Sequence, residues 1–351
     1  MKKFCSLALL LACTTAFSLT SCGQTAQTEG SAASNSGNSE EQSVTIIAAH
    51  ASTEENSMGQ FMIAVKDYIE SHSDSMTMQI YPAGQLGSDT ELAESVQEGS
   101  IQVACGSTGN YISVFPELCI FDLPFAYNDY YEMREIFGDP DLVAAVDAAA
   151  ARNGLKIGCI RTEGFRTLFS KEAVVHPGDI DGLSLRVMDN KYHLALWQEL
   201  GANVTTVAFT ELYTALQQGV VQAQENTVSS TMTNYNLYEV TNYATNTKHI
   251  PTVHTPLINL EFYNSLSPEQ QQVLIDAFEY ARVNEEDLQA ADLEYIDQLK
   301  SDYGYEYYEF TEEDLEECRA MTQDAWDMVM NDSDPEIYSA LQSAIEKQRG
   351  Q

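Results

Sequence analysis

The chain has 351 residues and a formal net charge of −36 at pH 7, with 53 acidic against 17 basic side chains. So large an excess of negative charge argues against a nucleic-acid-binding protein, because phosphates require a basic face, and it indicates a soluble, self-repelling surface. A chain of this length can bury a full hydrophobic core and favours two domains.

The first 22 residues have the organisation of a secretory signal peptide. Lys2 and Lys3 precede a largely apolar run over residues 4–17, which is too short to span a membrane. The segment 19–22, Leu-Thr-Ser-Cys, resembles the bacterial lipobox, whose cysteine receives a diacylglycerol. We expect residues 1–21 to be a lipoprotein signal peptide and Cys22 to be the lipidated N-terminus. The alternative is ordinary signal-peptidase cleavage, with Cys22 incidental.

Residues 22–43 are expected to form a lipid-anchored flexible tether. After Cys22 this segment contains no aromatic or branched aliphatic residue, so it has nothing with which to build a core. Its root-mean-square reach is about 25 Å for a flexible chain of this length. The folded part is therefore expected to start near Val44, and no later stretch approaches the roughly 20 apolar residues of a membrane-spanning helix.

Short strand-like runs alternate with amphipathic helical runs through the first half of the chain, which is the pattern of an α/β sheet covered by helices. We expect strands over residues 44–49, 76–81, 101–105 and 155–160, with helices over 58–71 and 90–98 between them.

The same alternation continues in the middle of the chain, and the last part is helical. Strands are expected over 183–187 and 204–207, and helices over 191–200 and 209–218. Ser267-Pro268-Glu269 has the composition of a helix start. The segment 270–302 could form one long helix that crosses two lobes, and closing helices are expected over 314–330 and 335–347.

Catalytic and metal-binding signatures are missing from the sequence. There is no nucleophile-elbow, zinc-protease, P-loop or dinucleotide motif. Beyond the anchor, four cysteines remain without a CxxC spacing, so buried free thiols are expected, although an exported protein permits a disulfide. Residues 331–334 resemble part of a calcium loop but lack its Gly and Glu, so a turn and helix cap is the expected structure. We expect no enzyme, no metal and no cofactor.

Arg186 is the most informative single residue. It lies in the strand 183–187, where its neighbours Leu185 and Val187 point to the opposite face. A charged side chain in such a strand must be exposed, paired or directed into a cleft. From the residues alone, a buried structural salt bridge and a cleft-facing cation both remain open.

The sequence around Arg186 is closely similar to the solute-binding subunit of the tripartite ATP-independent periplasmic (TRAP) transporters, the DctP-like family. The resemblance extends over nearly the whole chain after the tether. The segments that carry it are 81–87 (YPAGQLG), 121–125 (FDLPF), 164–166 (GFR), 179–187 (DIDGLSLRV), 201–203 (GAN), 209–221 (FTELYTALQQGVV), 224–226 (QEN) and 237–240 (LYEV).

The resemblance implies a role for each matched residue. The family's strand arginine falls on Arg186, and it forms a bidentate clamp on the ligand carboxylate. Arg166 corresponds to a second arginine near the ligand, and Asn226 to an asparagine that bonds the same carboxylate. Phe209 corresponds to a phenylalanine that packs against the ligand body. His50 lies where the first lobe approaches the ligand, although the match there is loose.

Three residues depart from the family pattern or have no place in it. Thr227 and Met188 occupy positions where the family usually has proline, so the loops there are expected to differ. Arg161 has no counterpart that the resemblance identifies. Together with the other two arginines it would suit a second anionic end of the ligand, and a surface role is equally open.

The resemblance implies an α/β fold of the two-lobed periplasmic-binding-protein type, with crossover strands and a long helix bridging the lobes. We expect lobe I to comprise residues 44–162 and 252–291, and lobe II to comprise 163–251 and 292–320. Residues 321–351 are expected to form C-terminal helices.

By the same resemblance, the protein is an extracytoplasmic monomer that captures a small carboxylate, either a dicarboxylate, a sugar acid or a keto acid. It would deliver this ligand to a small and a large TRAP membrane subunit for transport driven by an ion gradient, and would touch the membrane only through its lipid anchor. A ligand-presenting co-receptor for a membrane sensor kinase, using the same cleft, is the alternative.

Overall fold

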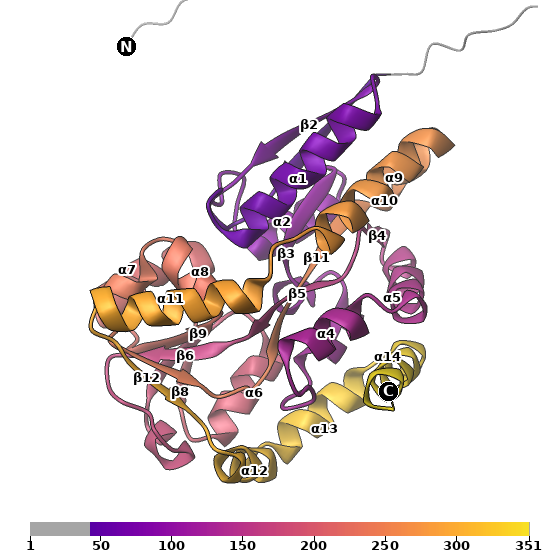
Figure 1. Cartoon of the computed structure of the whole chain (residues 1–351). Coiled ribbons are helices and arrows are strands. Elements are labelled where there is room, and N and C mark those ends of the chain that lie inside the picture. Colours follow the sequence, from indigo (N-terminus) through magenta and orange to yellow (C-terminus); the bar gives the residue numbers. More distant parts are fainter. Residues whose placement is uncertain (1–42, 351) are drawn as a thin grey trace, which may run out of the picture. The chain divides into compact units, whose positions relative to one another are not determined.

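The computed structural model describes residues 43–350 of the chain. The predicted signal peptide, Cys22 and nearly all of the predicted tether lie outside these residues. The described strands form two six-stranded sheets with helices packed around them (Figure 1). The predicted two-lobed α/β fold is confirmed, with one sheet in each lobe.

The sheet of lobe I contains the first three strands of the fold. Its order is β2 (Met76–Tyr81), β1 (Val44–Ala49), β3 (Val103–Ser107), β11 (Pro251–Asn259) and β4 (Leu155–Ile157), with β5 (Arg161–Phe165) also paired to β11. β1 is parallel to β2 and β3, whereas β11 is antiparallel to its neighbours. The helices α1 (Ser57–His72) and α10 (Pro268–Val283) bury a common core against this sheet.

The sheet of lobe II mixes strands from distant parts of the chain. Its order is β12 (Glu306–Glu309), β10 (Tyr243–Asn246), β6 (Thr167–Ser170), β9 (Ala223–Asn226), β7 (Ser184–Val187) and β8 (Asn203–Thr206). The helices of this lobe include α6 (Lys191–Glu199), α7 (Leu212–Gln217) and α8 (Val228–Thr233). Leu185 and Val187 are fully buried in its core, as their alternation in the strand predicts.

Two connections carry the chain between the sheets, as expected for crossover strands. Arg166 alone separates β5 from β6, and residues 247–250 separate β10 from β11. β5 and β11 also pair with each other, so the lobes are joined by two adjacent antiparallel strands (Figure 1). These crossings lie close to the predicted lobe boundaries after residues 162 and 251, and the limits of the lobes stay a proposal.

Residues 270–302 do not form the single long helix that was predicted. The segment forms two helices, α10 and α11 (Leu288–Asp302), separated by residues 284–287. Asn284 ends the first helix, and the Asp287 side chain accepts a hydrogen bond from the Ala290 amide to cap the second. α10 packs on α1 of lobe I and α11 packs on α8 of lobe II, so the segment still passes from one lobe to the other.

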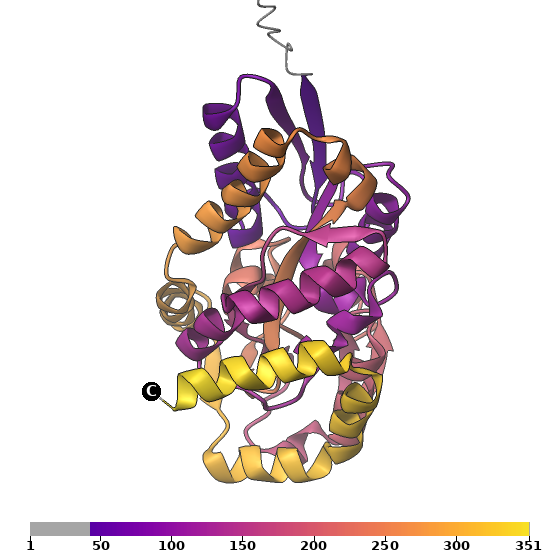
Figure 2. The same cartoon turned by 90° about the vertical axis from the view of Figure 1, so that its right-hand side faces the viewer.

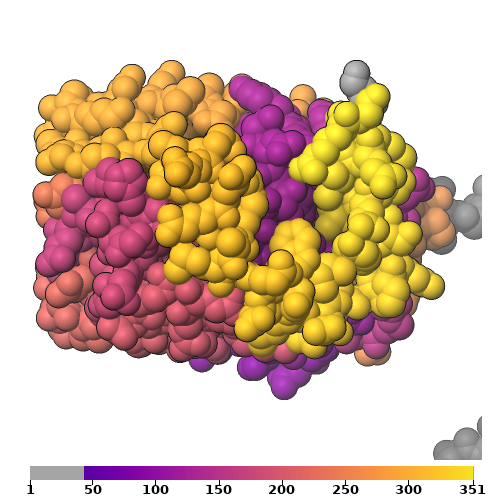
Figure 3. All heavy atoms as spheres, turned by 90° about the horizontal axis from the view of Figure 1, so that it is seen from below, coloured from indigo at the N-terminus to yellow at the C-terminus, as the bar shows by residue number. Residues whose placement is uncertain are grey.

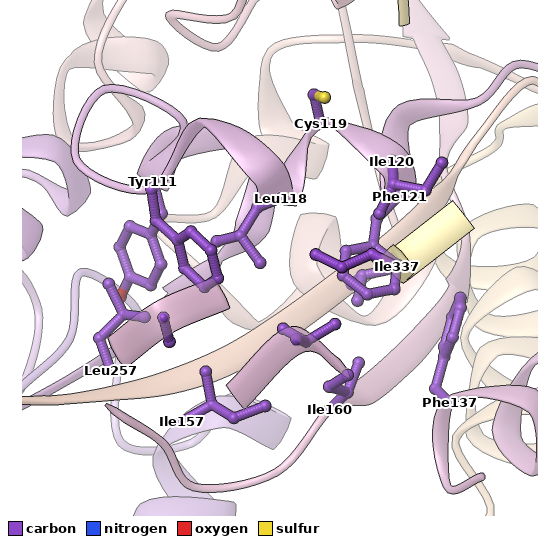
Figure 4. Packing of buried hydrophobic residues seen from close by; sticks show 14 of the residues in the cluster. Tyr111, Leu118, Cys119, Ile120, Phe121, Phe137, Ile157, Ile160, Leu257 and Ile337 are labelled. Atoms are coloured by element: carbon purple, nitrogen blue, oxygen red, sulfur yellow. The ribbon is translucent and has the colours of Figure 1, made fainter. Parts of the chain in front are cut away.

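The predicted helix over 314–330 is also two helices, α12 (Glu312–Met321) and α13 (Gln323–Asp332), which meet at the buried Thr322. The chain then returns to lobe I with α14 (Pro335–Arg349), which lies along α5 (Pro140–Arg152) (Figure 2). Ile337 of α14 packs into the lobe I core, near Phe121 and Phe137 (Figure 4). Together these helices cover much of one face of the protein (Figure 3).

Smaller expectations are confirmed in the same region. Ser267 and Gln270 form a capping box at the start of α10, with proline at the first helical position. The helix cap predicted within residues 331–334 is confirmed, because Asp334 accepts hydrogen bonds from two backbone amides at the start of α14. Asn331 and Asp332 still belong to α13, so the turn comprises only Ser333 and Asp334. Four cysteines are buried and free: Cys105, Cys119, Cys159 and Cys318. No helix within residues 43–350 is both long and apolar enough to cross a bilayer.

Candidate functional site

A cavity with a volume of about 680 Å³ opens between the two lobes. Lobe I contributes the loop after β2, the first half of α2 (Asp89–Gln97) and Asn110 of the short helix α3 (Thr108–Tyr111). Lobe II contributes Arg186 of β7 and the segment 206–211 after β8. Both lobes therefore contribute walls of the same cavity.

A smaller inner chamber of about 40 Å³ adjoins this cavity and shares Asp89, Asn110, Arg186 and Phe209 with it. Such a volume holds about two or three water molecules, which is close to the size of one carboxylate group. The remaining residues of the inner chamber are Ser52, Met58, Cys105, Gly106, Ser107, Arg166, Met188, Asn226, Ser230, Thr252 and His254.

Arg186 lines both cavities and is only 2% exposed. Its Nε donates a hydrogen bond of 2.8 Å to the carbonyl of Val207. Within residues 43–350, no carboxylate lies within ion-pairing distance of its guanidinium, and no other group accepts from its two terminal nitrogens. Burial lowers the pKa of Arg186 to about 10, so the side chain remains charged at neutral pH. The result is a buried cation that faces a cavity with most of its donors unused.

Arg166 lines the inner chamber, but its charge is compensated. Its Nε forms a buried ion pair with the carboxylate of Glu225. One terminal nitrogen also donates to the Glu225 backbone carbonyl at 2.6 Å, and the other donates to Thr252 Oγ1 at 3.2 Å. Burial opposes the ionisation of Glu225, but Arg166 and the hydrogen bond from His249 hold the pKa of that carboxyl well below its usual value. Arg166 therefore has an internal partner that the sequence did not predict.

Asn226 ends β9 at the inner chamber and is nearly buried. Its Oδ1 accepts a hydrogen bond of 2.9 Å from the backbone N–H of Thr227. The family usually has proline in place of Thr227. Proline carries no backbone N–H, so it could not hold the side-chain amide of Asn226 in this way. Thr227 in turn caps α8 through its hydroxyl oxygen. Thr227 therefore orients the Asn226 side chain through a backbone N–H that proline lacks.

The other residues singled out by the family comparison differ in whether they line the cavities. Phe209 is half-buried, lines both cavities and packs edge-to-face on Tyr235, with ring centroids 5.5 Å apart. Met188 lines the inner chamber where the family usually has proline. His50, directly after β1, is buried and lines neither cavity. Burial lowers the pKa of His50 to about 4, so its ring is neutral at pH 7.

Arg161, which the sequence left open, lies outside both cavities and is not on the surface either. Its guanidinium is buried and donates to Glu163 at 3.2 Å and to Glu285 through two nitrogens. Glu285 belongs to the break between α10 and α11. Arg161 therefore ties β5 to the segment between α10 and α11, and it lines neither cavity.

Asp89 is the site residue that the sequence analysis missed. It begins α2 two positions beyond the matched YPAGQLG segment, and it lines both cavities opposite Arg186. As a whole residue it is half-buried, but its carboxylate is enclosed, and that burial raises the pKa of Asp89 to about 6. Asn110 donates a hydrogen bond of 3.1 Å to its Oδ2. Nothing in the local sequence signals that Asp89 faces an arginine of the other lobe.

The model of the bacterial extracellular solute-binding protein family 7, DctP, matches residues 48–333. The chain belongs to this family. A solute-binding protein of Verminephrobacter eiseniae is 33% identical over 60% of this chain and 64% of its own length. The ectoine-binding periplasmic protein TeaA of Halomonas elongata is 30% identical over 66% of this chain and 68% of its own length. The chain thus spans about two thirds of these relatives.

Among solved structures, the sugar-acid-binding protein DctPAm of Advenella mimigardefordensis, in complex with galactonate, superposes with a TM-score of 0.81. It is 24% identical and covers 88% of this chain and 100% of its own, so it shows the shared fold. The resemblance inferred from the sequence is confirmed. As a DctP-family protein, the chain is an extracytoplasmic solute-binding protein, and membership favours ligand capture for transport over the sensor co-receptor.

Proposed function

We propose that this DctP-family protein binds a small carboxylate in the cleft through Arg186 and delivers it to the small and large membrane subunits of a TRAP permease. The observation that carries the proposal is the unpaired, buried guanidinium of Arg186 at the shared wall of the two cavities. A guanidinium is a planar, permanently charged fork that matches a carboxylate through two parallel hydrogen bonds.

The chamber beside Arg186 supports this assignment. It is about the size of a carboxylate group, and the side chain of Asn226 lines it from the end of β9. Phe209 offers an apolar ring at the opening toward the larger cavity, where the body of a ligand would lie. Because Arg186 is buried, the attraction between its guanidinium and a carboxylate is stronger there than at a surface.

Because the chain belongs to a family of solute-binding proteins, we propose that it binds and releases its ligand without chemistry, is not an enzyme and acts as a monomer. The strands β5 and β11, together with the break between α10 and α11, join the lobes at a few points and would allow them to close over a ligand. A carboxylate held by Arg186 would be released when the lobes separate at the permease.

We further propose that Cys22 carries a lipid that holds the protein at the outer face of the membrane. Support comes from the lipobox-like segment 19–22 and from the composition of residues 22–43, which predicts a flexible tether. Such a tether would reach about 25 Å, which would leave the folded part free to meet a permease in the same membrane.

A thermal-shift screen of the purified protein against dicarboxylates, sugar acids, keto acids and zwitterionic carboxylates tests the proposed function. A true ligand at 100 times its Kd should stabilise the protein by about 2.7 kcal/mol. Amines and neutral sugars without a carboxylate serve as the control set. Stabilisation by the control set alone would contradict carboxylate binding.

A further inference from the structure

The two cavities offer one cation that is free to receive a ligand carboxylate. Of the residues that line them, only Arg166 and Arg186 carry a permanent positive charge. Arg166 is held on both carboxylate oxygens and the backbone carbonyl of Glu225. Arg161 lies outside the cavities and is paired with Glu163 and Glu285. Arg186 alone remains, so the site can compensate one carboxylate and no more.

The wall opposite Arg186 carries the opposite charge. Asp89 faces the same cavities from lobe I, yet the two side chains are too far apart to form an ion pair with each other. Asn110 donates to Oδ2 of Asp89, while no residue within 43–350 donates a hydrogen bond to Oδ1. A Cβ atom on Gly106 would lie 2.7 Å from that Oδ1, so glycine at this position makes room for the carboxylate. Asp89 therefore lies in the cavity wall, and no described residue uses its Oδ1 as a hydrogen-bond acceptor.

The opening of the larger cavity adds further negative charge. Four exposed acidic residues line it together with Asp89: Glu91, Glu94, Asp189 and Glu211. A ligand whose first carboxylate binds Arg186 would place a second carboxylate among these like charges. Like charges a few ångströms apart repel each other strongly in a partly dry cleft. The charge distribution of the site thus opposes a dianion and favours a donor group.

We propose that the ligand is a monocarboxylate that also carries a hydrogen-bond donor, either hydroxyl or cationic nitrogen, on the side that faces Asp89. This inference rests on the proposed function, because it takes Arg186 as the carboxylate-binding residue. Asp89 then acts as a specificity-determining residue: it accepts from the donor of the correct ligand and repels the second carboxylate of a dicarboxylate.

Calorimetric titration of the purified protein with three classes of ligand tests the proposal. The classes are represented by ectoine, with a carboxylate and an amidinium; galactonate and related sugar acids, with a carboxylate and hydroxyls; and succinate and related dicarboxylates. At least one of the first two classes should bind more tightly than the dicarboxylates by about tenfold or more, because a hydrogen bond to a charged acceptor contributes that much. Which of the two binds identifies the donor as cationic nitrogen or hydroxyl.

Asp89→Asn keeps the shape of the side chain. It should lower the affinity for the donor-bearing ligand by roughly tenfold and reduce the difference in affinity between that ligand and dicarboxylates. Glu98→Gln is the matched control, because it removes one negative charge next to the end of α2 but lies outside both cavities. A thermal melt of each variant checks that the fold is kept.

The outcomes separate the inference from the proposed function. If Arg186→Ala abolishes binding while Asp89→Asn changes nothing, or if dicarboxylates bind as tightly as the other classes, the inference is wrong and the proposed function stands. If Arg186→Ala leaves binding intact, both are wrong. If none of the three classes binds, the inference is wrong, and the thermal-shift screen decides whether the proposed function stands.

Discussion

Arg166 and Glu225 form a buried ion pair at the point where the chain passes from β5 to β6. Glu225 lies on β9, directly opposite Leu168 in the antiparallel pair of β6 and β9. The pair therefore joins the connection between the lobes to the strand that ends in Asn226. A charge pair in this position supports the geometry of the inner chamber without itself being free for a ligand.

Breaking this pair should destabilise the protein. Glu225→Gln leaves the Arg166 guanidinium buried without a counter-charge, which costs about 3–5 kcal/mol. Glu279→Gln is the matched control, because it removes the partner of Arg282 in a more exposed pair within α10, where a loss of about 0–1 kcal/mol is expected. Denaturant unfolding of both variants measures the difference, and equal losses would contradict the structural role of Arg166.

The same pair predicts how stability changes with pH. The pKa of Glu225 in the folded protein lies well below its usual value of 4.5. Its contribution is therefore fully present above about pH 4.5, and it is lost as the pH falls through the folded-state pKa. The free energy of unfolding of the wild type should exceed that of Glu225→Gln most at neutral pH, and the gap should narrow in acid. A gap that stays constant down to pH 2 would contradict an ionised Glu225.

Replacing Arg186 should reduce ligand affinity without a loss of stability, whereas breaking the Arg166–Glu225 pair should reduce stability. Arg186→Ala should reduce ligand affinity on the order of 10² to 10³ or more, because a closed cleft would then hold an unpaired carboxylate. Arg186→Lys should also bind weakly, since the charge remains but the bidentate geometry is lost.

The thermal melt of these two variants distinguishes a binding arginine from a structural one. Within residues 43–350, Arg186 makes a single hydrogen bond, to Val207, and forms no ion pair. Its removal should therefore leave the melting temperature unchanged or raise it. Calorimetric titration and a thermal melt of the same sample measure the ligand affinity and the stability. Near-normal affinity together with a large loss of stability would show a structural role for Arg186.

Cys22→Ser should release the protein from the membrane into the soluble extracytoplasmic fraction, with ligand affinity unchanged. The physical reason is that only a lipid on this cysteine is expected to hold the protein there, and Cys22 precedes the folded part by a predicted tether. Fractionation combined with metabolic labelling by a lipid precursor measures the effect. Cys13→Ser, within the predicted signal peptide, is the control, and a Cys22→Ser protein that keeps its lipid label would contradict the anchor.

The family, the α/β alternation and the positions of the residues in long motifs were predictable from the amino-acid sequence alone. Arg186, Asn226 and Phe209 all line the cavities, as the resemblance implied. Their position in the cavity walls was predictable because strand alternation and an ordered motif specify which residues reach the end of a strand. Their roles in ligand binding stay a prediction. His50, whose match was loose, lies outside the cavity walls.

Which of the buried arginines is free for a ligand depends on how the strands and lobes pack. Arg161, Arg166 and Arg186 are all buried, and nothing in their local sequences distinguishes them. Glu225, 59 positions after Arg166, reaches it by strand pairing, and Glu285 reaches Arg161 because the predicted long helix breaks there. Asp89 faces Arg186 from the other lobe. An ion pair requires atoms within a few ångströms of each other, and that proximity is set by how the strands and lobes pack, which spacing along the chain does not specify.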